Sequence, residues 1–214
     1  LGLPDAQVLA AQAERALAQG APEEELTADV RAGYTGVIAV LRCGEGPTVA
    51  MRFDIDALPM TECPLNMHRP TREGFASENP GMMHACGHDG HAAIGLGVAR
   101  ILMAHRDALH GTVKLIFQPA EEGVRGAYAI VENGWLDDVD VLLASHVAPT
   151  GKADDGDVTV GTWGSLATTK YDVAFTGRAA HAGGFPEQGK NALLAAASAA
   201  LALHAIPRHG SGQS

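Results

Sequence analysis

The pattern of apolar and polar positions predicts helices and strands in alternation. Apolar residues recur at three- and four-residue spacing within residues 5–31 and 92–109, which predicts helices. Shorter apolar runs bounded by turn residues predict strands. These predicted strands cover residues 35–42, 48–58, 112–118 and 138–148, and a further helix is predicted near 126–134. We expect the last two strands to be buried and residues 59–82, rich in Pro, Glu and Arg, to form a loop. The order predicts an α/β fold with a mostly parallel sheet flanked by helices.

The pattern changes after about Gly161, which predicts a second domain. Residues 165–180 alternate as a half-exposed strand does, and an alanine-rich helix is predicted over 191–206 after a glycine-rich loop. One strand and one helix do not close a domain. We therefore expect a first domain over residues 1–165, with N- and C-terminal parts missing, and the start of a smaller α+β domain over 166–214.

Composition narrows the function classes. The formal charge of −10 argues against a nucleic-acid partner, because phosphate binding needs basic patches. No run of eighteen apolar residues is present, so no membrane span is expected. The three cysteines are irregularly spaced and form no disulfide framework, which favours a reducing, cytoplasmic setting.

The stretch HACGHDGHAA, residues 84–93, concentrates side chains that bind metals. A single histidine in an apolar helix is usually a hydrogen-bonded core residue. Cys86 and His88, two positions apart just before a helix, instead suit a borderline divalent metal. We expect His84, Asp89 and His91 to orient these ligands. Cys86 as a nucleophile with a histidine base is the alternative.

Two further segments place chemistry at the ends of predicted strands. Glu121 and Glu122 follow residues 112–118 directly, and His146 closes the strand predicted over 138–148. In parallel sheets such positions meet at one edge. One glutamate of the pair suits a metal, and the other suits a bound water from which it takes a proton.

The motifs MRFDIDALP, HACGHDGHAA, FQPAEEG, SHVAP and GRAAHAGGFPEQGKNAL, taken in this order, resemble a known family. They are similar to the amidohydrolase branch of the dinuclear metallopeptidases, which includes hippurate, N-acyl-amino-acid and auxin-conjugate hydrolases. The resemblance spans residues from about 34 to 206. LGLPDAQVLAAQAERALAQG and HRPTREGFAS add a similarity to the A-type subunits of p-aminobenzoyl-glutamate hydrolases.

The resemblance implies a metal-dependent, cytoplasmic amidohydrolase. It would cleave the amide of an N-acyl amino acid, with p-aminobenzoyl-glutamate as the first candidate substrate. It implies two divalent ions per subunit, with manganese expected first and zinc as the alternative. It also implies a homodimer, or a heteromer with a related B-type subunit, and makes residues 166–214 the start of a lid and dimerisation domain.

The resemblance also implies roles for individual residues. Glu121 would be the general base, and Asp54 would orient the site from its periphery. His181 would steady the oxyanion in the site of a partner subunit, and Asn191 would help to shape the substrate site of the lid. The implied metal ligands are Cys86, His88, Glu122 and His146. A further metal-binding histidine, near the C-terminus of family members, would lie beyond residue 214.

Two other functions remain open from the residues alone. A thiol hydrolase with Cys86 as its nucleophile would not explain the presence of Glu121, Glu122 and His146. A catalytically silent, metal-holding subunit of a heteromer leaves Glu121 without a task. Hydrolysis of a different N-acyl amino acid, of the hippurate type, is the alternative within the same chemistry.

Overall fold

The computed structural model describes residues 4–147, 156, 158, 161 and 171–206. The chain folds as two compact units, Leu1–Lys152 and Ala153–Ser214. No helix in these described ranges is both long and apolar enough to cross a bilayer.

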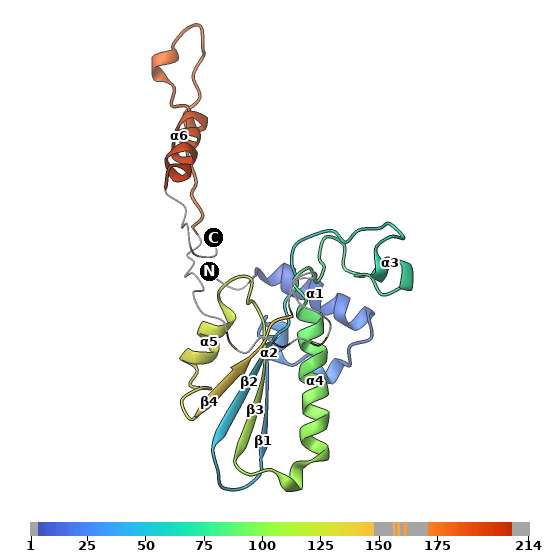
Figure 1. The fold of residues 1–214 in the computed structure, drawn as a ribbon. Helices are drawn as coiled ribbons and strands as arrows, with labels where there is room; N and C mark the ends of the chain where they lie inside the picture. Colours follow the sequence, from blue (N-terminus) through green and yellow to red (C-terminus); the bar gives the residue numbers. More distant parts are fainter. Residues whose placement is uncertain (1–3, 148–155, 157, 159–160, 162–170, 207–214) are drawn as a thin grey trace. The chain divides into compact units, whose positions relative to one another are not determined.

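The elements of the first unit follow the predicted order (Figure 1). They are α1 (Ala6–Ala18), η1 (Glu23–Glu25), α2 (Ala28–Arg31), β1 (Val37–Arg42), β2 (Thr48–Asp54), α3 (Arg69–Glu73), α4 (His88–Ala104), η2 (Arg106–Ala108), β3 (Thr112–Gln118), α5 (Gly126–Glu132) and β4 (Val141–Ala144). The α/β prediction is confirmed. The segment expected to be a loop contains the short helix α3, which begins with Pro70 in its first turn and ends at Gly74 in a left-handed conformation.

The second unit contains η3 (Pro186–Gln188) and α6 (Ala192–His204), so the predicted alanine-rich helix is confirmed. The strand expected over residues 165–180 is not found in its described part, 171–180. There the only pairing is an isolated antiparallel bridge between Arg178 and Lys190. Residues 165–170 of this prediction lie outside the described residues.

The sheet places three carboxyl strand ends together. Its order is β1-β3-β2-β4, in which β2 runs parallel to both β3 and β4 and β1 is antiparallel to β3. The mostly parallel sheet is therefore confirmed, although β3 separates the sequence neighbours β1 and β2. Asp54 lies opposite Gln118 at the ends of β2 and β3. Side chains that follow these strands emerge at one edge.

Helix α4 lies along the sheet and packs on β2 and β3 (Figure 1). The rings of Phe53 and Phe117 lie 5.6 Å apart and meet the helix at Gly95. A Cβ atom built on Gly95 would lie 2.6 Å from the Phe117 ring and 2.9 Å from the Phe53 ring. The absence of a side chain at Gly95 thus sets how closely α4 approaches the sheet.

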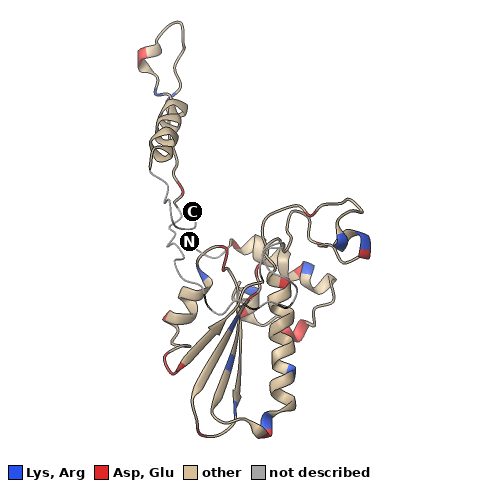
Figure 2. Ribbon diagram, in the orientation of Figure 1, with Lys and Arg blue, Asp and Glu red and all other residues tan. Residues whose placement is uncertain are grey.

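The strands also carry basic side chains (Figure 2). Lys114 of β3 is buried, and its ammonium group donates to the Trp135 carbonyl oxygen at 2.8 Å and pairs with Asp138. This contact ties the segment between α5 and β4 to the sheet. The prediction that β4 is buried is wrong: Val141, Leu142 and Leu143 are each about half exposed, because β4 lies at the edge of the sheet and, among the described residues, pairs only with β2.

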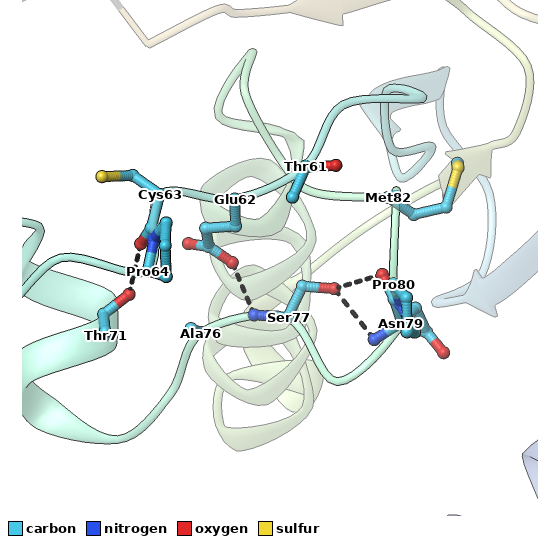
Figure 3. A pocket seen from close by; sticks show the side chains of 11 residues that line it. Thr61, Glu62, Cys63, Pro64, Thr71, Ala76, Ser77, Asn79, Pro80 and Met82 are labelled. Carbon is cyan, nitrogen blue, oxygen red and sulfur yellow. Dashed lines mark hydrogen bonds between the residues drawn. The ribbon is translucent and has the colours of Figure 1, made fainter.

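The connection between β2 and α4 is closed by backbone pairing of two residues outside the sheet. Leu58 and Met83 exchange two backbone hydrogen bonds, and the chain between them lines an open pocket of about 290 Å³ (Figure 3). Glu62 holds this connection together, since its carboxylate accepts hydrogen bonds from the Ser77 amide and from His68. The Ser77 hydrogen bond, followed by His68, lowers the pKa of Glu62.

We expect Gly95→Ala to destabilise the protein by about 1–3 kcal/mol, because the new methyl group would overpack against the two phenylalanine rings. The matched control is Gly97→Ala in the same helix, where a Cβ meets no atom within 4 Å. Alanine there should stabilise by about 0.5–1 kcal/mol. Chemical denaturation of both variants measures the difference, and equal effects would contradict the packing argument.

The stability that Glu62 contributes should depend on pH. Its pKa is lowered on folding, so the contribution is present above the unfolded pKa of about 4.3 and is lost as pH falls through the lower folded pKa. Denaturation of the wild type and of Glu62→Gln between pH 3 and 7 should show a wild-type advantage near neutrality that shrinks in acid. Glu73→Gln, on the exposed helix α3, controls for the loss of one charge from this connection; the same profile for both variants would contradict the role of Glu62.

Candidate metal centre

Side chains from three segments converge at the carboxyl edge of the parallel strands. The ligand atoms of Cys86, His88 and His146 lie within 4.8 Å of one another. Those of His88, Glu121 and Glu122 do so as well. The structure therefore brings together the four expected metal ligands and Glu121, with the buried His88 shared by both groups.

Gly87 allows this approach. It precedes α4 with a φ of +83°, a left-handed conformation that favours glycine. A Cβ atom on Gly87 would lie 2.3 Å from the Val147 side chain, so a larger residue would push the segments apart. With glycine in place, Cys86 Sγ lies 3.4 Å from His146 Nε2.

Two histidines present an imidazole nitrogen to this space. His88 Nδ1 donates to the backbone oxygen of Asp56 at 3.0 Å, and His146 Nδ1 donates to that of Val147 at 2.8 Å. Each Nε2 is thereby left unprotonated in the neutral ring, as metal binding requires. His88 Nε2 is buried and has no hydrogen-bond partner among the described residues. It lies 3.8 Å from Asp54 Oδ1 and 4.0 Å from Glu122 Oε1, a spacing that suits a shared cation.

His91 has a different task, because both its ring nitrogens are engaged. Nδ1 donates to the carboxylate of the buried Asp54, and Nε2 accepts from the Val147 amide at 2.9 Å. His91 thus orients the segment that carries His146. Burial alone raises the pKa of Asp54, but the His91 hydrogen bond and the charge of Arg52 more than offset it and hold this pKa below its usual value.

Asp56 is a residue at the site to which the sequence had assigned no role. Its backbone oxygen accepts from His88, its Oδ1 lies 3.3 Å from the same ring nitrogen, and its Oδ2 accepts from the Glu122 amide at 3.0 Å. A backbone carbonyl behind a metal-binding histidine is one of the usual ways to fix the ring, and here it is the Asp56 backbone oxygen that accepts from His88. The signal was present in the Asp54-x-Asp56 spacing, which puts both side chains on one side of an extended chain. His84 and Asp89, expected to orient ligands, are exposed.

The two glutamates lie in a turn with unusual backbone geometry. Ala120 and Val124, on either side of the pair, both have a φ of 55°, which is rare for residues other than glycine and especially for a β-branched one. The Val124 amide donates to the Glu121 carbonyl oxygen at 2.8 Å and closes the turn. Such conformations cluster at functional sites.

Cys86 is poorly suited to act as a nucleophile by itself. Burial, followed by the negative charge of Glu122 and a hydrogen bond with it, raises the pKa of the Cys86 thiol. Reactive cysteines show the opposite shift, because a neighbouring cation or helix N-terminus stabilises their thiolate. A bound cation among these carboxylates would supply that stabilisation.

The two candidate residues of the second unit have clear local roles. His181 Nδ1 accepts hydrogen bonds from the Gly183 and Gly184 amides at 3.2 and 2.9 Å, so the proton of the neutral ring lies on Nε2. Asn191 is the N-cap of α6, and its side-chain oxygen accepts from the Leu193 and Leu194 amides. A contact between Asn191 and substrate would therefore fall to its amide nitrogen.

The sequence matches the model of peptidase family M20/M25/M40 over residues 50–211. The chain belongs to this family. The resemblance to its amidohydrolase branch is confirmed by the relatives of this M20 chain. It is 57% identical to an indole-3-acetyl-aspartic acid hydrolase from Enterobacter agglomerans and 54% identical to the A-type subunit of p-aminobenzoyl-glutamate hydrolase from Escherichia coli (strain K12). Each match covers 100% of this chain and 49% of the relative.

A solved structure supports the fold. The aminobenzoyl-glutamate utilization protein from Klebsiella pneumoniae is 46% identical, with a TM-score of 0.68 over 100% of this chain and 47% of that protein. This M20 chain therefore spans about half the length of the relatives it matches.

The site predicts that metal stabilises the protein. Adding Mn²⁺ or Zn²⁺ to chelator-treated protein should raise the melting temperature, since the metal binds only the folded site. His88→Ala should weaken metal affinity at least about tenfold. His84→Ala, an exposed histidine four residues earlier, is the control and should bind metal as the wild type does. Titration calorimetry gives both affinities, and equal loss in the two variants would contradict this assignment.

Proposed function

We propose that the protein is a metal-dependent amidohydrolase that cleaves an N-acyl amino acid, with p-aminobenzoyl-glutamate as substrate. The observation that carries the proposal is the convergence of Cys86, His88 and His146 with the Glu121–Glu122 pair at one sheet edge. A cysteine, two histidines and a carboxylate form a suitable donor set for a divalent metal, and a second carboxylate beside them suits a proton acceptor.

Cys86, His88, Glu122 and His146 would hold the metal. We infer two divalent ions per subunit, manganese first and zinc as the alternative, with a further ligand from outside the described residues. Bound there, the metal would lower the pKa of a water molecule and polarise the substrate carbonyl. Asp56 supports this arrangement, because it anchors both the His88 ring and the Glu122 backbone.

Glu121 is the proposed general base. Its carboxylate lies in the same group as His88 and Glu122. It also lies 3.9 Å from the Arg52 guanidinium, which is not a metal ligand. In this role Glu121 accepts a proton from the attacking water and then donates it to the leaving nitrogen, so that the amine departs neutral. Asp54 supports the site indirectly, through His91 and Arg52.

His181 is the proposed oxyanion donor. Its Nε2–H is the kind of group that stabilises the charge that develops on a carbonyl oxygen, and the Gly183 and Gly184 amides hold the ring in the required tautomer. We propose that it acts in the site of a partner subunit, in a homodimer or in a heteromer with a B-type subunit. Asn191 would assist by contacting substrate through its amide nitrogen.

The relatives support an aromatic acyl group joined to an acidic amino acid. The Escherichia coli relative is named for p-aminobenzoyl-glutamate and the Enterobacter agglomerans relative for indole-3-acetyl-aspartate. Indole-3-acetyl-aspartate is therefore the second candidate substrate. A cytoplasmic setting also stays a proposal, supported by three free cysteines at positions 43, 63 and 86.

The test is release of p-aminobenzoate by the full-length protein, alone and with a B-type subunit, after metal removal and Mn²⁺ addition. We expect metal to restore activity. We expect Glu121→Gln to lower kcat at least about a hundredfold, because the base is lost while the ligands remain. Glu132→Gln, on α5 outside the site, is the control and should be unaffected.

The outcomes separate the alternatives. Activity that survives chelation and is lost in Cys86→Ser would favour the thiol hydrolase. Metal binding without release from any N-acyl amino acid, with or without the second subunit, would favour a silent metal-holding subunit. Faster release from indole-3-acetyl-aspartate would keep the mechanism and change the substrate.

A further inference from the structure

Arg52 of β2 links several site residues although it is not among the predicted ones. Its Nε donates to Gln118 Oε1 at 2.9 Å, and its Nη1 lies 2.7 Å from Asp54 Oδ2. Its Nη2 lies 3.9 Å from Glu121 Oε1. The Arg52 guanidinium therefore faces three acceptors. One lies in β2, one in the neighbouring strand β3 and one in the turn that follows β3.

The sheet fixes the direction of this guanidinium group. In the parallel register Arg52 pairs with Ile116 and Asp54 pairs with Gln118, so Arg52 reaches Gln118 diagonally across the strands. Gln118 and Asp54 are buried, with 3% and 1% of their surface exposed. The planar fork is thus held at two nitrogens by groups that have little freedom, which determines where the third nitrogen points.

The third nitrogen, Nη2, faces the Glu121 carboxylate, which lies among other acidic side chains. Glu121 and Glu122 are adjacent in the chain, and Asp54 and Asp56 lie in contact with the same group of histidines. Like charges this close repel, and each would otherwise turn toward solvent or toward the bound metal. Arg52 is a permanent cation whose attraction acts on Glu121 alone of the two glutamates, while the Glu121 carboxylate stays within 4.8 Å of the His88 and Glu122 ligand atoms.

We propose that Arg52 is the positioning residue of the general base: it holds the Glu121 carboxylate beside the metal ligands without letting it become one. This inference rests on the proposed function, in which Glu121 is the base. Through Asp54 and His91, the same guanidinium is connected to the Val147 amide next to His146. Arg52 thus sets the base relative to the ligands.

The test uses the full-length, Mn²⁺-loaded protein and the substrate that it turns over. Arg52→Gln should lower kcat about tenfold to a hundredfold, because a displacement of about 1 Å costs that much in a positioned reaction. KM and Mn²⁺ affinity should each stay within about threefold, since Arg52 contacts neither substrate nor ligand in this proposal. Arg72→Gln, an exposed arginine of α3, is the control and should leave all three quantities unchanged.

Two further variants separate positioning from a structural role. Arg52→Lys keeps the charge beside the buried Asp54 and should fold and bind Mn²⁺ as the wild type does, but its single ammonium cannot hold three partners, so kcat should fall between those of the wild type and Arg52→Gln. In a Glu121→Gln background, Arg52→Gln should change kcat less than about threefold, because residues that act as one unit are not additive. Fully additive losses, an effect confined to KM, or a loss of Mn²⁺ affinity matching the loss of kcat would each overturn the proposal.

A structural readout tests the inference independently of activity. In crystals of the Mn²⁺-loaded Arg52→Gln variant, the Glu121 carboxylate should be displaced by about 1 Å or more from its wild-type position. An unchanged Glu121 would overturn the positioning role, whatever the enzyme hydrolyses. A wild-type protein that releases nothing from any N-acyl amino acid would instead overturn the proposed function, and the crystal comparison would still decide the role of Arg52.

Discussion

The hydrogen bond between His91 and Asp54 is the interaction on which the site depends. It joins the end of β2 to the first turn of α4, and His91 extends it to the Val147 amide beyond β4. Both side chains are almost fully buried, so the bond is shielded from water and from competing partners. Arg52 and His91 keep the buried carboxylate ionised against the penalty of burial. Three segments far apart in sequence are thereby joined without any contribution from the metal ligands.

That scaffold gives one residue type different tasks. In His88 and His146, Nδ1 donates to a backbone oxygen and Nε2 stays available for metal. In His91, both nitrogens are engaged, by the Asp54 carboxylate and by the Val147 amide. The neighbours of each ring, rather than the motif itself, decide which histidine can bind metal. The same logic applies to Cys86, because its acidic surroundings disfavour a free thiolate and favour one held by a cation.

The sequence predicted the main helices and strands of the first unit and the edge where the candidate site lies, because both follow from local patterns. Periodicity shows which residues lie in a strand, and parallel strands bring Glu121, Glu122 and His146 together whatever their neighbours are. Strand order is not local, so the position of β3 between β1 and β2 could not be seen. The predicted burial of β4 was too high for the same reason, since a strand of apolar residues has the same sequence pattern at the centre and at the edge of a sheet. The hydrogen-bond partners of individual polar atoms could not be predicted from the sequence either. Only the structure shows that the Asp56 backbone oxygen accepts from His88 while the Asp54 carboxylate accepts from His91.

The pair of adjacent glutamates shows how backbone and charge together produce two functions from one residue type. The Glu122 amide is fixed by Asp56, while the left-handed residues Ala120 and Val124 force the chain to turn sharply around the pair. Both carboxylates lie in the His88 group, but Glu122 Oε1 is 4.0 Å from His88 Nε2 and Glu121 Oε1 is 3.9 Å from Arg52 Nη2, so that only Glu121 also faces Arg52. The strained backbone at Ala120 and Val124 therefore fits a site in which one glutamate binds metal and the other accepts a proton.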